Sequence, residues 1–233
     1  MKKITLFIVF ILLSITYNYS QQELSNIIFS HSENQTIYFY EYNGKLKVKA
    51  DYKTQIQAVN EYPEQLIQSV LSATNQKWVN YNTLGGEKKA RKKSEKHFKQ
   101  IKKMDRKKNY FELHHKLRFK IDGLDTVIIK FFFYQEKELP VSGAMVMQKI
   151  NKRWFVTSRS DLSVFAIMIM RLKTEALKGI ILGNSTNQDI ETFHKMVSVK
   201  NNIELSLFEK EFTNLYLPEN INKKELFIDP KTW

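Results

Sequence analysis

The stretch Tyr110–Ile121 alternates between two kinds of side chain, and this pattern restricts the fold more than any other feature of the sequence. A period of two places successive side chains on opposite faces of a strand. The pattern therefore predicts a long antiparallel strand with one buried face. The buried register holds Phe111, Leu113, His115, Leu117, Phe119 and Ile121, and the polar register holds Tyr110, Glu112, His114, Lys116, Arg118 and Lys120.

Three further strands are expected to follow the first one in a meander. Asp122-Gly123 favours a tight turn into a second strand over Thr126–Glu136, which is apolar on nearly both faces. A third strand is expected over Ala144–Ile150, and a fourth over Trp154–Ser158. Nearer the N-terminus, Asn43-Gly44 lies between two strand-like runs and predicts a separate hairpin.

Helical periodicity appears in two places before the sheet and again after it. Pro63 opens a run with apolar residues at helical spacing that ends at Gly85-Gly86. The basic stretch Lys88–Lys108 has a narrow apolar stripe, which includes Phe98, Ile101 and Met104. This pattern predicts a second helix. After the sheet, helices are expected from Ser160 to Gly179, near Asp189–Val197 and near Leu205–Leu215.

These elements predict an α+β fold. It has an N-terminal hairpin, two helices packed on a curved antiparallel sheet of about four strands, and a helical C-terminal extension. The corresponding segments are residues 21–60 for the hairpin, 61–160 for the α+β domain and 161–233 for the extension.

The first residues are typical of a secretory signal peptide. Lys2 and Lys3 precede an apolar block over Ile4–Ile15, and cleavage after Ser20 would make residues 1–20 the signal. An uncleaved membrane anchor is the alternative. The chain contains no Cys, so an exported domain of this size relies on its core rather than on disulfides. We therefore expect a bacterial protein that is periplasmic, associated with the envelope or secreted.

Most of the net charge of +13 belongs to one segment. Glu87–Lys108 contains twelve Lys or Arg and three acidic residues, which is a local balance of +9. Lysines on such a helix either face water or bind an anionic lipid or polysaccharide. Export disfavours nucleic acid as the partner. The candidate anion-binding residues are Lys92, Lys93, Lys99 and Lys103.

His115 is the single candidate for catalysis. It occupies the buried register, where desolvation shifts the pKa of a titratable group, and a pocket beside it would let it act as a base or bind a ligand. The alternative is that His115 is a core histidine with a purely structural role. His114 is expected on the opposite face. We expect no metal and no cofactor, because the histidines lack ligand spacing and the chain has neither a nucleophile elbow nor a phosphate-binding glycine loop.

The segment from Tyr62 to Ser160 resembles the NTF2-like superfamily. The resemblance rests on two helices that feed a curved sheet and on the late hairpin Gln148–Thr157, in which Lys152 stands where that group usually has Gly. The resemblance implies a cone-shaped sheet around a pocket, in a group that holds isomerases, dehydratases and many non-enzymatic binding modules. A cystatin-like arrangement of helix and meander has the same pattern.

Three hypotheses follow for function. The first is a non-enzymatic binding or assembly module of the bacterial envelope, which recognises a small ligand or an envelope protein through the cone interior or the sheet face. The second is an enzyme of the NTF2-like type that uses His115. The third is attachment to an anionic surface through the basic helix. The sequence leaves the ligand and the oligomeric state open.

Overall fold

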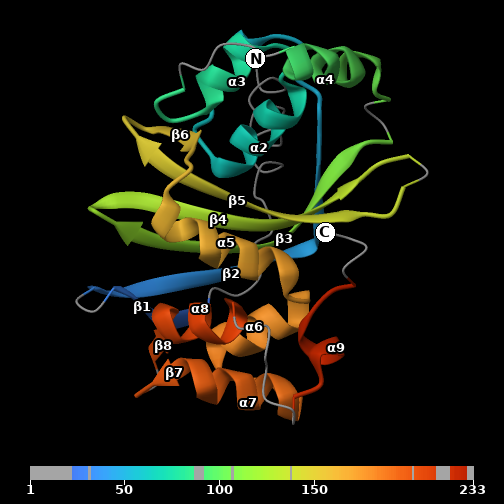
Figure 1. The fold of residues 1–233 in the computed structure, drawn as a ribbon. Helices are drawn as coiled ribbons and strands as arrows, with labels where there is room; N and C mark the ends of the chain where they lie inside the picture. The colour runs from blue at the N-terminus through green and yellow to red at the C-terminus, as the bar shows by residue number, and fades with distance from the viewer. Residues whose placement is uncertain are drawn as a thin grey trace, which may run out of the picture.

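The computed structural model describes residues 23–30, 33–86, 92–105, 108–136, 138–200, 202–213 and 221–229. The predicted signal peptide lies outside these residues. The described chain has an α+β fold, as the sequence predicts, with one mixed and mostly antiparallel sheet between two groups of helices (Figure 1).

The sheet has eight strands in the described part of the chain, twice the number expected. The order is β6-β5-β4-β3-β2-β1-β8-β7, and only β1 and β8 pair in parallel. The expected meander is confirmed as β3 to β6, and the N-terminal strands extend it because β2 pairs along β3. The strands are β1 Glu23–Ser30, β2 Glu33–Lys49, β3 Tyr110–Ile121, β4 Leu124–Tyr134, β5 Val141–Ile150, β6 Arg153–Val156, β7 Ser198–Val199 and β8 Asn202–Glu204.

Helices cover both faces of the sheet and enclose a core on each side. Figure 1 shows α2, α3 and α4 at the top of the view, α5 in front of the middle strands, and α6 to α9 in the lower half of the view, near β1, β7 and β8. The larger core lies beneath α5 to α8, and the smaller one lies between α2 and the sheet. The helices are the 3-10 turn η1 Gln55–Gln57, α2 Pro63–Ser72, α3 Gln76–Asn82, α4 Lys92–Lys103, α5 Ser160–Arg171, α6 Thr174–Leu182, α7 Gln188–Val197, α8 Leu205–Thr213 and α9 Lys223–Leu226.

Two of the expected helices are each broken into a pair. The first run ends at Ser72, and Asn75 starts α3 by accepting a hydrogen bond from the backbone of Trp78. The run after the sheet ends at Arg171, and α6 begins at Thr174. Apolar periodicity continues across both breaks, so it did not reveal them.

The predicted turn at Asn43-Gly44 is wrong. β2 continues through it, and both halves of β2 pair with β3 in the same antiparallel direction. The pairing skips from Glu41 opposite His115 to Leu46 opposite Leu113, so the intervening residues form a bulge, with Lys45 at a φ of 55°. Asn-Gly tolerates positive φ, which suits a bulge as well as a hairpin turn. The actual N-terminal hairpin joins β1 to β2.

The prediction that β3 keeps one buried face throughout is also wrong. Its pairing with β4 shifts register between Leu113 and His115, so one extra residue sits in β3. An inserted residue exchanges the two faces of the strand. Leu113 accordingly packs in the α2-side core, whereas Leu117 packs in the core beneath α5 to α8.

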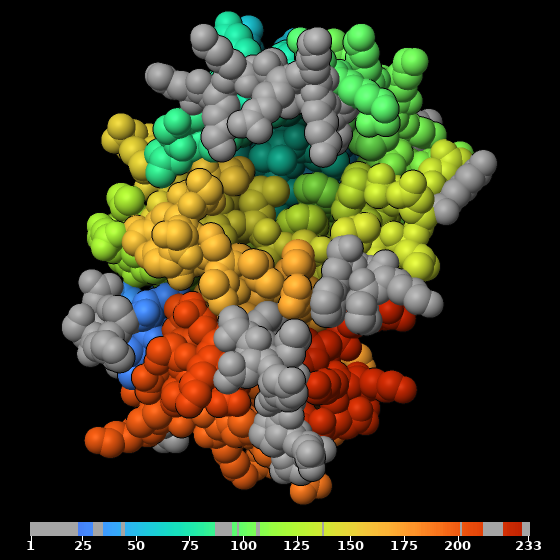
Figure 2. All heavy atoms as spheres, in the orientation of Figure 1, coloured from blue at the N-terminus to red at the C-terminus, as the bar shows by residue number. Residues whose placement is uncertain are grey.

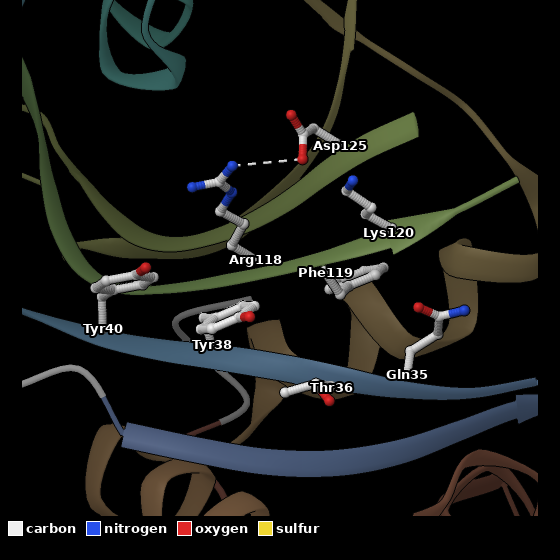
Figure 3. A pocket seen from close by; sticks show the side chains of 8 residues that line it. All are labelled: Gln35, Thr36, Tyr38, Tyr40, Arg118, Phe119, Lys120 and Asp125. Carbon is white, nitrogen blue, oxygen red and sulfur yellow. Dashed lines mark hydrogen bonds and ion pairs between the residues drawn. The ribbon is translucent and has the colours of Figure 1, made fainter. Parts of the chain in front are cut away.

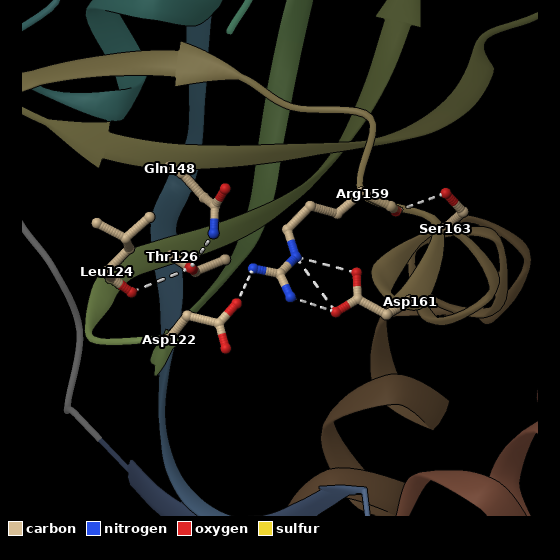
Figure 4. Close-up of polar contacts among 7 residues, drawn as sticks. All are labelled: Asp122, Leu124, Thr126, Gln148, Arg159, Asp161 and Ser163. Atoms are coloured by element: carbon tan, nitrogen blue, oxygen red, sulfur yellow. Dashed lines mark hydrogen bonds and ion pairs between the residues drawn. The ribbon is translucent and has the colours of Figure 1, made fainter.

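The Asp122-Gly123 turn forms as expected and is tied to the start of α5 by Arg159. Both turn residues have positive φ. The Arg159 guanidinium contacts the carboxylates of Asp122 and Asp161, and the Ser163 hydroxyl donates to its backbone carbonyl (Figure 4). These contacts hold the β3–β4 turn against a helix that begins after β6.

Replacing Arg159 with Gln is expected to lower the free energy of unfolding by about 1 kcal/mol, because two charge pairs on a partly exposed arginine are lost together. Arg159 lowers the pKa of Asp161, chiefly by its hydrogen bonds. This stabilisation is present above the unfolded pKa of Asp161 and is lost as the pH falls through the lower folded value. Urea unfolding at neutral and acid pH measures it. Lys195→Gln, which breaks one exposed pair with Glu191, serves as the smaller control.

Candidate functional site

His115 is one of the residues that line a polar cavity of about 400 Å³ between the sheet and α6. The other lining residues include Glu41 from β2, Thr174 and Lys178 from α6, and residues after α6. The His115 side chain has no solvent-exposed area and packs against Phe39, with ring centroids 4.7 Å apart. Neither ring nitrogen has a hydrogen-bond partner among the described residues.

Burial decides the protonation of His115. Desolvation, followed by the positive charges or partial charges of His114, Lys130 and Lys178, lowers its pKa to about 3. The imidazole is therefore neutral at physiological pH and a weak base. Both ring nitrogens are buried, although the residue borders the cavity. This environment gives no support to a proton-transfer role for His115.

His114 lies on the same side as His115, contrary to expectation. Its Nδ1 is 3.1 Å from the hydroxyl of Thr174, which also lines the cavity above His115. Its Nε2 is 3.1 Å from Glu112 Oε1, and burial is the main cause that lowers its pKa. The register shift after Leu113 explains why neighbouring residues approach the same helix.

Two buried lysines were not singled out by the sequence. Lys116 pairs with Glu64 of α2 at 3.0 Å, and Tyr42 donates to the same carboxylate at 2.6 Å. Lys130 donates to the carbonyls of Ile169 and Met170, at 2.7 and 3.0 Å, at the end of α5. Lys116 occupies the polar register of an alternating strand, which gave no sign of burial. Lys130 lies in a run that is apolar on nearly both faces, but the α5 carbonyls that it contacts come from a distant segment.

The predicted basic helix exists as α4, and its lysines are only partly brought into a site. Lys99, Lys102 and Lys103 are exposed, while for Lys92 and Lys93 the structure describes the helical backbone alone. Ile101 and Met104 point inward as the apolar stripe predicts, since they line a groove with residues of α2 and the sheet. The predicted stripe also includes Ala90, which lies outside the described residues.

The α4 groove has a volume of about 600 Å³ and a mostly apolar wall. Its floor is Phe111 of β3 and Phe133 of β4, whose rings meet edge to face at 5.0 Å. Figure 2 shows α4, in green at the upper right, over the end of the β4–β5 hairpin. The apolar walls come from Val70, Leu71, Ile101 and Met104, and the polar lining residues are Gln100, Lys103, Asn109 and Gln135.

The groove is thus apolar inside and cationic at the rim. Lys103 belongs to both the wall and the exposed lysines of α4. Nearby, Lys108 forms an ion pair with Glu136, which raises the pKa of that lysine. Such an arrangement suits a ligand with a hydrocarbon part and a negative charge.

In the described ranges, no three His, Asp or Glu side chains are placed to hold a metal ion. Within the same ranges, every helix is too short or too polar to cross a bilayer.

Comparison of the chain with protein-family models, curated proteins and solved structures finds no match.

Proposed function

We propose that the protein is an exported, non-enzymatic binding module of a bacterial envelope, and that it holds an anionic amphiphile such as a fatty acid in the α4 groove. The observation that carries the proposal is the apolar groove beneath exposed lysines of α4. The proposal combines the first and third hypotheses, since the hydrocarbon part of the ligand enters the α4 groove and the basic helix contacts the negative charge of the ligand.

The chemistry of the groove supports this ligand class. Each methylene that leaves water contributes about 0.8 kcal/mol, so a short stretch of hydrocarbon on Phe111 and Met104 supplies useful affinity. An exposed lysine that pairs with the carboxylate of the ligand adds at most about 1 kcal/mol. Small-ligand pockets commonly measure roughly 300–1,000 Å³, a range that contains this groove.

The resemblance to NTF2-like proteins agrees with the proposal, because that group keeps its pocket between helices and a curved sheet. Export rests on Lys2, Lys3 and the apolar block after them. Membership of the NTF2-like group and export are both proposals for this chain.

Fluorescence of cis-parinaric acid tests the groove. We expect the purified protein to bind it, and palmitate to displace it better than the uncharged alcohol of equal chain length. Met104→Trp, which fills the groove, is expected to weaken binding about tenfold, a loss of about 1.4 kcal/mol. Changing Lys99, Lys102 and Lys103 to Gln is expected to remove the preference for the acid over the alcohol.

The matched control changes three exposed lysines elsewhere, Lys77, Lys152 and Lys224, to Gln. It should leave binding as it is. Anionic vesicles separate the groove from simple surface attachment. If the α4 lysine variants stop sedimentation with vesicles while Met104→Trp leaves fatty-acid binding intact, the helix acts as a surface anchor and the groove proposal is wrong.

A further inference from the structure

A further cavity, of about 520 Å³, lies on the face of the sheet that carries the α4 groove, at the opposite end of β3 from that groove. Tyr38 and Tyr40 project from β2, Arg118 and Lys120 from β3, and Asp125 from β4, as Figure 3 shows. We call Tyr38, Tyr40, Arg118 and Lys120 the tyrosine–cation surface. Tyr38 stands opposite Arg118 in the strand register, so the aromatic row runs beside the cationic row.

The tyrosine–cation surface is the open continuation of a buried row. Tyr42 and Lys116 belong to the same two rows but are buried, where both contact Glu64 of α2. Beyond α2 the rows come into the open. Tyr38 is 38% exposed, and the Arg118 side chain is 49% exposed.

We propose that the tyrosine–cation surface binds an acidic oligosaccharide, with sugar rings on Tyr38 and Tyr40 and sugar carboxylates on Arg118 and Lys120. This site is independent of the α4 groove.

The tyrosines are suited to be fixed platforms for rings. Residues two apart on a strand are about 6.8 Å apart and share a face, so consecutive units of an extended chain can meet consecutive rings. Tyr40 is held in place by Lys116, whose Nζ lies 5.1 Å from the ring centroid. Lys116 is itself fixed by Glu64 at 3.0 Å. A rigid aromatic ring loses little conformational freedom when it binds a ligand.

The charges of the site favour a sugar acid over a nucleic acid. Arg118 and Lys120 supply two positive charges, and Asp125, which lies 3.4 Å from Arg118, supplies one negative charge. Sugar hydroxyls can donate to Asp125 and to the side chains of Gln35 and Thr36, which also line the cavity. A DNA backbone offers no hydrogen-bond donor to Asp125, whereas the hydroxyls of a sugar acid do.

The test uses a short oligogalacturonate, with calorimetry on the purified protein. The matched ligand is the same oligomer with its carboxylates methyl-esterified, which keeps the rings and removes the charge. We expect the acid to bind at least about tenfold more tightly than the ester. Tyr38→Ala and Tyr40→Ala are each expected to weaken binding about tenfold, whereas Tyr38→Phe keeps it because the ring remains.

Charge variants complete the design. Arg118→Gln and Lys120→Gln should weaken binding of the acid and leave the weak binding of the ester unchanged, while Lys77→Gln on α3 changes neither. Circular dichroism confirms that each variant is folded. Equal binding of acid and ester, or no binding of the acid, overturns the proposal. Binding of single-stranded RNA that is lost in the same tyrosine variants also overturns it and assigns the surface to nucleic acid.

Discussion

Replacing Glu64 with Gln is expected to destabilise the protein by about 3–5 kcal/mol, because the change leaves the Lys116 ammonium buried without its counter-charge. Glu64 is 2% exposed and Lys116 is 8% exposed. Burial lowers the pKa of Lys116, and the Glu64 carboxylate opposes that shift. Urea unfolding at pH 7 gives the free energy of unfolding directly.

A matched change on the surface is the control. Glu191→Gln removes the same charge from an exposed pair with Lys195, one helical turn away on α7, and is expected to cost far less than Glu64→Gln, because water screens an exposed pair. The combined variant Glu64→Leu with Lys116→Met should recover most of the loss, since an apolar pair of similar size leaves no buried charge. A cost below about 1 kcal/mol for Glu64→Gln would show that water or other groups screen Lys116.

The same pair links core and surface. Lys116 contacts the ring of Tyr40, so its displacement in Glu64→Gln reaches the tyrosine–cation surface without a change in any residue that would touch the sugar.

Local patterns in the sequence were sufficient to predict the central part of the fold. Alternation gave β3 its bounds, and Asp122-Gly123 placed the turn into β4. The inward stripe of α4 was predicted from Ile101 and Met104, which do line the groove. These features depend on neighbours along the chain, and a period of two or 3.6 records them.

Features that depend on distant segments were not predicted. The bulge of β3 between Leu113 and His115 lies beside the bulge of β2, because Glu41 pairs with His115 and Leu46 pairs with Leu113. Neither bulge changes the alternation of apolar and polar residues in the sequence. The prediction for His114 failed for this reason, since one extra residue in a strand exchanges its faces.

The extra width of the sheet has a similar cause. β1 pairs with β8, whose residues lie near the other end of the chain, and the short strands β7 and β8 give little periodicity of their own. Arg118 and Lys120 were assigned correctly to a polar register. Their grouping with Tyr38 and Tyr40 required the pairing of β2 with β3, which the hairpin expected at Asn43-Gly44 had concealed.

Lys130 is expected to make the stability of the protein depend on pH above neutrality. Its side chain has no exposed area, and burial lowers its pKa from 10.5 to about 7, an effect that Glu175 opposes. Between these two values the unfolded chain holds a proton on Lys130 that the folded protein has released. Stability therefore rises with pH in this window, by up to about 1.4 kcal/mol per pH unit at 25 °C.

Lys130→Met isolates this effect. The variant fills a similar volume but loses the hydrogen bonds to Ile169 and Met170, and that loss shifts its stability by an offset that varies little with pH. The advantage of the wild type over Lys130→Met is expected to be smallest below pH 7, where both folded and unfolded wild-type chains carry the charge. It should then grow steadily as the pH approaches 10.

Unfolding by urea at a series of pH values measures the two curves, and Lys149→Met on β5, a lysine that is only partly buried, is the control that should stay parallel to the wild type. Parallel curves for Lys130→Met would mean that Lys130 keeps its proton in the folded state throughout this range. In that case the hydrogen bonds of Lys130 outweigh its desolvation, since Ile169, Met170 and Ser142 offer three acceptors, as many as an ammonium can use. The difference in the free energy of unfolding between the wild type and Lys130→Met, followed against pH, therefore decides whether desolvation or these three hydrogen bonds set the charge of Lys130.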